Sequence, residues 1–268
     1  MLIQEQALTH WIDYFYGYGS WKAPVWFIAY EESGGDVPED VADRINYFSK
    51  VHTNPEPALC DIRELYNAIE ARLSGPRANK FTTLFDHRFG KQAIIHGGWK
   101  NLIAFVHGYR NKKIPDLLAY QKKYFASASA QEALINLYPL PSPHNHAWYY
   151  SWLDLPGLSY SRNRILYEET VYEKRIRTLL QKIDLHKPDV VLMYGMNNIN
   201  SLKKSIQASF KTYKAIKQQI PQHHCADFNG TTLVITSQVP TLRHNRIETG
   251  FDWYSFGKMV RAGLYRKS

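Results

Sequence analysis

Residues 25 to 36 read Val-Trp-Phe-Ile-Ala-Tyr-Glu-Glu-Ser-Gly-Gly-Asp, and this stretch decides which fold is expected. The apolar run from Val25 to Ala29 has the length and composition of a strand that is buried on both faces. Two carboxylates, Glu31 and Glu32, follow this strand directly, and Pro38 then begins a helix. Strand, acidic turn and helix together are how an open α/β sheet builds a site at the carboxyl end of a strand.

The turn continues through Ser33, Gly34 and Gly35, where the backbone can adopt unusual dihedral angles and a ligand can approach it closely. The main-chain amides of these three residues can hold a phosphate or a carbonyl oxygen. A solvated surface loop between a strand and a helix has the same local sequence. This stretch alone therefore leaves both a binding site and a plain loop open.

Three further apolar runs are predicted as strands, at Ala133–Leu140, Asp189–Tyr194 and Thr231–Thr236. Helical patterns separate the four runs. We therefore expect an α/β fold with three α-β-α layers and a central, mostly parallel four-stranded sheet. No Pro/Gly/Ser-rich linker interrupts the sequence, so residues 1–268 are expected to form a single domain.

Unusual polar loops follow three of the four predicted strands. These loops are Glu31–Glu32, Pro141–His146 and Ser237–Asn245. In a parallel sheet such loops gather at one edge, where they can share a single cleft.

The composition of the chain favours a nucleic-acid partner. The 268 residues carry a formal net charge of +9, and the sequence pI is near 9.3. An excess of basic groups attracts polyanions. Aromatic residues make up 14% of the chain, with 7 Trp and 19 Tyr, and such rings can stack on bases. DNA is therefore the expected partner.

The two cysteines, Cys60 and Cys225, are too few for a cysteine-ligated iron–sulfur cluster or a four-cysteine zinc site. They also argue against a disulfide scaffold and favour a reducing cytoplasm. His144 and His146 form a pair with metal-ligand spacing, but no acidic or cysteine set accompanies them, so we expect neither a metal nor a cofactor. The N-terminus lacks a signal-peptide pattern, and no apolar run approaches the ~20 residues that cross a bilayer.

Taken together, these loops resemble those of the uracil-DNA glycosylase superfamily. The first strand of that superfamily ends in a motif such as Gly-Gln-Asp-Pro-Tyr-His, Gly-Ile-Asn-Pro-Gly or Gly-Glu-Ala-Pro-Gly, and residues 28–34 occupy that place here. Residues 135–137, Ile-Asn-Leu, are similar to the strand that carries a base-reading asparagine. Residues 236–245 are similar to the His-Pro-Ser loop, which supports the leaving base and inserts into the double helix. The resemblance spans about residues 20 to 264.

The chain departs from the pattern of the superfamily at several positions. Ala29 and Glu32 replace the usual Gly and Pro of the first motif, and Gln238 and Val239 stand where a His normally precedes Pro. The departures affect uracil specificity more than the fold. Some members of the superfamily act on modified bases, including hypermodified cytosines of phage DNA as an antiviral defence, and the altered pocket keeps that substrate class open.

The resemblance implies a DNA glycosylase that extrudes a modified base and hydrolyses its N-glycosidic bond, leaving an abasic site. Glu31 is the expected carboxylate next to the anomeric carbon, with Glu32 as its substitute or as a helix N-terminal charge. His244 and Gln238 are candidates for the hydrogen-bond donor that the missing family histidine supplies, although His244 also fits a surface histidine near DNA.

Substrate contacts are expected from the same loops. Asn136 can read a base edge, Tyr30 can stack on the extruded base, and the amides of Ser33 and Gly34 can bind a base carbonyl or a phosphate. A buried structural amide and a core ring are the alternatives for Asn136 and Tyr30.

The expected DNA-binding residues lie in and after the last loop. Leu242 and Arg243 fit a wedge and plug for the vacated base position, and Arg246 and Lys258 can contact phosphates. A packed loop leucine and solvated cations are the alternatives for these residues.

Two other functions remain open at this level. A nucleic-acid-binding module without catalysis fits the missing histidine, and it predicts DNA binding without an abasic product. A nucleoside or nucleotide hydrolase fits the acidic turn in a doubly wound sheet, and it predicts activity on free nucleosides.

Overall fold

The computed structural model describes residues 3–34, 37–77, 79–129, 131–143, 148–151, 153, 155–216, 220–240 and 251–263. Its strands are β1 (Phe15–Tyr18), β2 (Val25–Ala29), β3 (Ala58–Cys60), β4 (Glu132–Asn136), β5 (Val190–Tyr194), β6 (Lys211–Tyr213), β7 (His223–Phe228) and β8 (Thr231–Ile235). Its α-helices are α1 (Glu5–Tyr14), α2 (Pro38–Val51), α3 (Ile62–Asn67), α4 (Leu84–Arg88), α5 (Gly97–Tyr109), α6 (Leu117–Lys123), α7 (Arg164–His186), α8 (Ile199–Ile206) and α9 (Trp253–Arg261). Two short 3₁₀ helices are η1 (Gly75–Arg77) and η2 (Pro156–Arg162).

All eight strands belong to one mixed sheet with the order β3-β1-β4-β2-β5-β8-β7-β6. The four strands predicted from the sequence are its four central neighbours, and β4, β2, β5 and β8 pair in parallel. The expected strand number of four was too low, because short strands extend the sheet on both sides. On one side, β1 pairs antiparallel with β4 and parallel with β3; on the other, β7 and β6 add antiparallel pairs.

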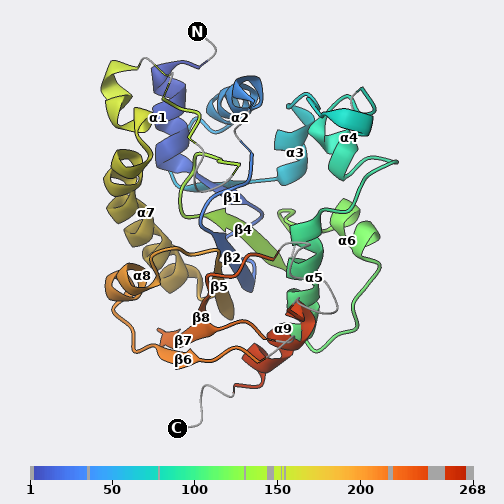
Figure 1. The fold of residues 1–268 in the computed structure, drawn as a ribbon, viewed down its shortest axis with the longest axis vertical. Helices are drawn as coiled ribbons and strands as arrows, with labels where there is room; N and C mark the ends of the chain where they lie inside the picture. Colours follow the sequence, from blue (N-terminus) through green and yellow to red (C-terminus); the bar gives the residue numbers. More distant parts are fainter. Residues whose placement is uncertain are drawn as a thin grey trace.

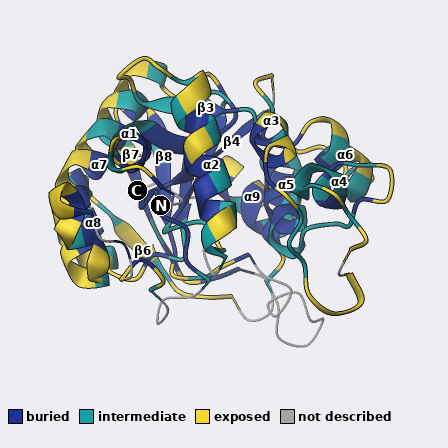
Figure 2. Ribbon diagram, turned by 90° about the horizontal axis from the view of Figure 1, so that it is seen from above, coloured by how far each residue is buried: buried dark blue, intermediate teal, exposed yellow. Residues whose placement is uncertain are grey.

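Helices cover both faces of the sheet (Figure 1). Neighbouring residues of β2 show this alternation: the ring of Phe27 packs against Phe105 of α5, whereas the ring of Trp26 lies next to His186 of α7. Residues on β2 are buried along its whole length, which explains the uninterrupted apolar run in the sequence. Figure 2 shows the buried sheet between helices whose outer surfaces are exposed.

The amphipathic pattern of residues 1–22 predicts a first helix that ends near Gly17 and Gly19, but the helix is shorter in the structure. Helix α1 ends at Tyr14, and the chain then enters β1. Gly17 has a φ of +135°, and a Cβ at this position would lie 2.0 Å from the carbonyl oxygen of Leu134 on β4. The glycine therefore allows β1 to approach the β4 backbone, which only this residue type permits at such a distance.

A buried arginine joins the sheet to α7. The Arg175 guanidinium donates to the main-chain carbonyls of Asn136, Leu137 and Phe15, at 2.7, 2.9 and 2.8 Å. These bonds fix the carboxyl end of β4 relative to β1. Asn136 is the last residue of β4, so the same bonds also fix its position.

Candidate functional site

A cavity of about 660 Å³ opens at the carboxyl edge of the parallel strands. Its lining includes Ala29 of β2, Asn136 of β4 and Tyr194 of β5, together with Val239 and Pro240 after β8. The cavity thus collects residues from the ends of all four parallel strands. Strand order reverses direction around β2, because the chain passes from β2 to β4 on one side and then to β5 on the other. Such a reversal is where open α/β sheets bind ligands.

The three polar loops meet at this edge. The acidic turn and the loop after β8 both contribute lining residues. In the loop after β4, the amide of Ser142 donates to the carbonyl oxygen of Glu32 at 2.9 Å, which attaches that loop to the acidic turn. The remainder of this loop, 144–147, lies outside the described residues.

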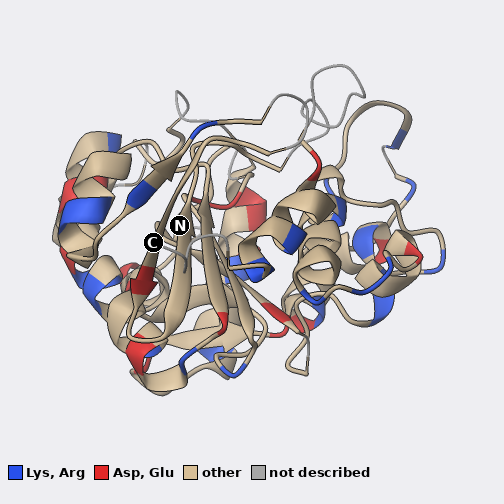
Figure 3. Ribbon diagram, turned by 90° about the horizontal axis from the view of Figure 1, so that it is seen from below, with Lys and Arg blue, Asp and Glu red and all other residues tan. Residues whose placement is uncertain are grey.

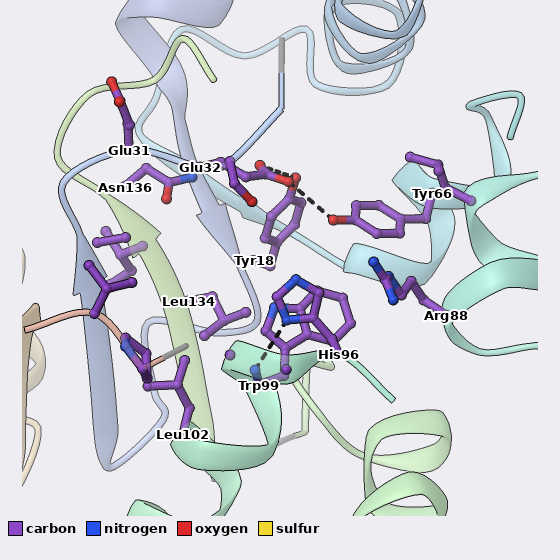
Figure 4. Close-up of a pocket in the computed structure, with 18 of the residues that line it drawn as sticks. Tyr18, Glu31, Glu32, Tyr66, Arg88, His96, Trp99, Leu102, Leu134 and Asn136 are labelled. Carbon is purple, nitrogen blue, oxygen red and sulfur yellow. Dashed lines mark hydrogen bonds between the residues drawn. The ribbon is translucent and has the colours of Figure 1, made fainter. Parts of the chain in front are cut away.

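Glu32 presents its carboxylate to the cavity in a fixed orientation. Arg44 of α2 donates to Oε1 at 2.8 Å, the Tyr66 hydroxyl donates to the same oxygen at 3.1 Å, and the Tyr18 hydroxyl donates to Oε2 at 2.8 Å (Figure 4). Arg44 also donates to the Tyr18 oxygen at 3.0 Å. The carboxylate has four lone-pair positions and receives three bonds, so one acceptor position is left for a ligand or water.

Glu31 makes a different set of contacts. Arg164, at the start of α7, donates through one nitrogen to both Glu31 oxygens, at 2.7 and 2.6 Å. Arg164 also donates to Glu168 at 2.8 Å. Burial raises the pKa of Glu31 to about 7, and Arg164 opposes that rise. In Figure 4 the Glu31 carboxylate is directed away from Tyr66 and His96. Glu31 also lines the cavity, but both of its oxygens accept from Arg164, whereas Glu32 faces Tyr18 and Tyr66 with one acceptor position left, so the geometry favours Glu32 as the carboxylate that meets a ligand.

Asn136 lies at the end of β4, is buried, and lines the cavity. Its side-chain amide makes no hydrogen bond to any residue that the structure describes, which leaves both of its polar atoms for a ligand. Ser33 also lines the cavity, beside Glu32. Gly34 has a φ of +129°, and a Cβ at this position would meet nothing within 4 Å, so the glycine supplies a bend and open space.

Tyr30 does not line this cavity. Its side chain lies on the other side of β2, in a second cavity of about 440 Å³ that also includes Tyr138 and Glu168. The Tyr30 and Tyr138 ring centroids are 4.8 Å apart. The structure therefore separates Tyr30 from Asn136 and Glu32, and a ring that stacks on a base in the main cavity has to come from elsewhere.

Gln238 and Lys258 also stand apart from the cavity lining. The Gln238 backbone amide donates to Thr236 Oγ1 at 3.2 Å, and its carbonyl accepts from Gly195 at 3.1 Å, so this residue shapes the turn before Val239. Lys258 lies on α9, which crosses α5 near Phe105 and Gly108, whereas the cavity is lined by the first turn of α5. His244, Leu242, Arg243 and Arg246 lie outside the described residues.

One whole wall of the cavity was not predicted from the sequence. Residues of the segment 84–102 that line it are Leu84, His87, Arg88, His96, Gly97, Gly98, Trp99 and Leu102. The buried Gln121 side chain holds this segment in place, because it donates to the carbonyls of Arg88 and Ile94 and accepts from the His96 amide, at 2.7, 3.2 and 2.8 Å. A signal was present: a histidine followed by two glycines at the start of an apolar helical pattern.

His96 caps α5 and is held in one tautomer. Its Nδ1 accepts from the Trp99 amide at 3.2 Å, so the proton of the neutral ring is on Nε2. Burial, followed by the nearby charge of Arg88, lowers the pKa of His96 to about 3. The ring is thus a neutral hydrogen-bond donor in the same cavity as Glu32 and Asn136.

Comparisons with protein-family models, with curated proteins and with solved structures found no match. Among the residues that the structure describes, no group of three or more His, Cys, Asp or Glu side chains gathers at metal-binding distance. Within the same residues, no helix combines the length and apolar character needed to span a bilayer. Cys60 and Cys225 are both buried free thiols.

Proposed function

We propose that the protein is a DNA glycosylase of the uracil-DNA glycosylase type, which extrudes a modified base and hydrolyses its N-glycosidic bond. The observation that carries this proposal is the shared cavity, in which a held carboxylate, Glu32, and an unpartnered amide, Asn136, occur at the edge of a parallel sheet. A volume of about 660 Å³ falls in the range of small-ligand sites and accommodates a nucleoside. The substrate class we propose is hypermodified phage DNA, from which the enzyme excises the modified base as an antiviral defence.

The chemistry of the reaction matches these side chains. The bond between the anomeric carbon and the base nitrogen breaks, its electron pair leaves with the base, and a water oxygen bonds to the carbon. The proton that this water loses ends on the departing base. Glu32 stabilises the positive charge on the sugar and orients the water. The Nε2–H of His96 donates to the negative charge that develops on the base, and Asn136 reads the base edge. Glu31 positions Arg164 and the turn.

Aromatic rings line the cavity for a base to contact. Trp99 and Tyr66 have ring centroids 6.1 Å apart, and His96 lies 4.6 Å from Trp99. Enzymes that act on an extruded base stack it against such rings and bind its polar edge. These rings take the role that the sequence assigned to Tyr30.

DNA phosphates can be bound beside the cavity. Leu73 and Leu84 line the cavity, and the segment between them carries Arg77 and Lys80, both exposed and without an acidic partner among the described residues. In Figure 3, Lys and Arg positions recur on the right-hand side, where Figure 1 places α3, α4 and α6. Such cations bind a phosphate backbone without reading its sequence.

The decisive experiment is an abasic-site assay. Wild type and Glu32→Gln are incubated with DNA that contains uracil, with unmodified DNA, and with DNA that carries glucosylated hydroxymethylcytosine, and alkali then cuts abasic sites. We expect wild type to create abasic sites, seen as alkali cleavage, in one modified DNA, and Glu32→Gln to lose that activity. If no DNA is cut while salt-dependent binding persists, the protein is a binding module. Release of bases from free nucleosides instead identifies the small-molecule hydrolase.

A further inference from the structure

Arg88 is a cation in the cavity wall that lacks a counter-charge. Its guanidinium lines the cavity at the end of α4 and is partly buried. It makes no hydrogen bond and no ion pair with any side chain or carbonyl in the described part of the chain. Burial lowers the pKa of Arg88, which means that its charge is destabilised by the loss of water.

Other desolvated arginines of the protein differ from Arg88 in this respect. Arg44, the other arginine of the cavity wall, pairs with Glu32 at 2.8 Å. Arg175 and Arg63 are also desolvated, but each donates to several main-chain carbonyls. Desolvated cations in proteins are paired as a rule. Arg88 is partly buried and has no anionic partner among the described residues, which points to an anion supplied by a ligand in the cavity.

Neutral hydrogen-bond donors lie near Arg88, and no described carboxylate pairs with it. The His87 side chain is 3% exposed and lines the cavity, and neither of its ring nitrogens has a hydrogen-bond partner among the described residues. A neutral imidazole always carries one N–H, so His87 holds a donor that no described residue uses. Figure 4 shows Arg88 beside His96, across the cavity from Glu31 and Asn136.

The first turn of α5 completes this wall. Gly97 and Gly98 line the cavity, and their amides donate no hydrogen bond to a described residue. The first amides of a helix lack intrahelical partners, and the helix dipole favours an anion there. Helix α5 has 13 residues, so its dipole is fully developed. A Cβ on Gly98 would lie 3.1 Å from the Pro240 carbonyl oxygen, so the glycine also lets the last loop close this end.

We propose that Arg88, His87 and the amides of Gly97 and Gly98 form a subsite for an oxyanion, a phosphate or a carboxylate, on the ligand that fills the cavity. The identity of the ligand as a nucleotide rests on the proposed function, whereas the anion subsite itself does not. The anion is then either the phosphate of the extruded nucleotide or an acidic group on its modified base. Either source places the anion at the Arg88 end while the base edge or sugar meets Asn136 and Glu32.

The first test measures anion binding without any base excision. Inorganic phosphate is titrated by calorimetry into the full-length wild type, Arg88→Gln and the control Arg177→Gln, which removes an exposed cation of α7 outside the cavity lining. We expect Arg88→Gln to weaken binding about 10- to 100-fold, as for the loss of charge-assisted hydrogen bonds, and Arg177→Gln to change it less than about twofold. Equal binding by wild type and Arg88→Gln, or no saturable binding by wild type, overturns the subsite.

Thermal unfolding provides a second readout of phosphate binding and shows whether the variant folds. Because Arg88→Gln removes an uncompensated charge, the variant is expected to fold and to melt at or above the wild-type temperature without phosphate. Phosphate is expected to raise the melting temperature of wild type and Arg177→Gln but not that of Arg88→Gln. A phosphate-induced rise of equal size in all three proteins contradicts the proposal.

Three small ligands identify the source of the anion. Deoxycytidine 5′-monophosphate and 5-carboxydeoxycytidine are compared with deoxycytidine. Tighter binding of the monophosphate assigns the subsite to a backbone phosphate, and tighter binding of the carboxylated nucleoside assigns it to the base. Equal binding of all three overturns the subsite. If anion binding depends on Arg88 but no DNA acquires abasic sites, the anion subsite is supported and the glycosylase function is rejected.

Discussion

Glu31 and Glu32 are adjacent in the sequence, but their carboxylates bind different arginines on different helices. Glu31 accepts from Arg164 of α7, and Glu32 accepts from Arg44 of α2. Successive side chains of an extended segment point in opposite directions, so one carboxylate joins the turn to each neighbouring helix. Only the Glu32 carboxylate is directed toward the tyrosines and His96 in the cavity (Figure 4).

The two glutamates are therefore expected to differ in function. Glu32→Gln should lower the single-turnover rate of base release about 10²- to 10³-fold, whereas Glu31→Gln should lower it less than about tenfold. Glu32→Gln should also reduce the free energy of unfolding by about 3 kcal/mol, because the buried Arg44 loses its carboxylate. Glu31→Gln should cost about 1 kcal/mol, since Arg164 keeps Glu168. A larger rate loss in Glu31→Gln than in Glu32→Gln would reverse the assignment.

His96→Asn separates the capping role of His96 from its donor role. Asparagine is a good N-cap residue, so the free energy of unfolding should change by less than about 1 kcal/mol. The shorter side chain cannot place a donor where Nε2 lies, and the rate should fall about 10²-fold or more. Because the pKa of His96 is lowered to about 3, the wild-type rate should show no titration of this ring between about pH 5 and 8. A rate in His96→Asn equal to that of wild type would leave His96 a cap only.

DNA affinity should depend on the cations beside the cavity. The double variant Arg77→Ala/Lys80→Ala should bind DNA more weakly, and the slope of log K against log salt should fall by about one to two units. The matched control Lys258→Ala/Arg261→Ala removes the same number of charges from α9, away from the cavity. Fluorescence anisotropy at several salt concentrations measures both slopes. A larger change in the control would place the DNA path over α9, as the sequence suggested for Lys258.

Buried Glu132 should make stability depend on pH. It is 0% exposed on β4, it accepts from the Tyr120 hydroxyl at 3.0 Å, and burial raises its pKa to about 7. Between its ordinary pKa and about 7 the folded state holds one proton that the unfolded chain has lost. The Glu132 contribution to stability is therefore lost as pH rises through this window, by up to about 1.4 kcal/mol per pH unit.

Urea unfolding of wild type and Glu132→Gln at several pH values tests this expectation. Glutamine does not titrate, so the difference between the two free energies of unfolding should change with pH, in favour of Glu132→Gln as pH rises. A constant difference across the window would show that the folded and unfolded states hold the Glu132 proton equally.

The sequence predicted the central sheet because its four strands are continuous apolar runs, which only full burial explains. The flanking strands were harder to predict. Phe15–Tyr18 continues the pattern of the preceding helix, and Ala58–Cys60 and Lys211–Tyr213 have three residues each, too few for a period to appear. Their strand conformation comes from pairing with partners distant in the sequence, which local propensity does not encode.

The same distinction holds for the site. Glu32 and Ser33 directly follow a predicted strand, so the carboxyl-edge rule located them. Asn136 was singled out within a predicted strand by the resemblance of residues 135–137 to a base-reading strand. Tyr30 was expected to stack on the base or to be a core ring, and it lines the second cavity; the sequence could not place it, because side-chain direction past the end of a strand depends on how the chain bends. His87, Arg88 and His96 belong to a segment without periodicity, and contacts with Gln121 of α6, distant in the sequence, fix its position.

The uncompensated charge of Arg88 has a consequence for how ligands enter. Glu32 and Arg44 form an ion pair at one end of the cavity, whereas Arg88, at the opposite end beside the first turn of α5, has no acidic partner among the described residues. Apolar walls screen charge poorly, so the positive potential of Arg88 is expected to extend through the opening. A ligand with an unequal charge distribution is therefore turned before it touches either wall, and it enters with one preferred end leading.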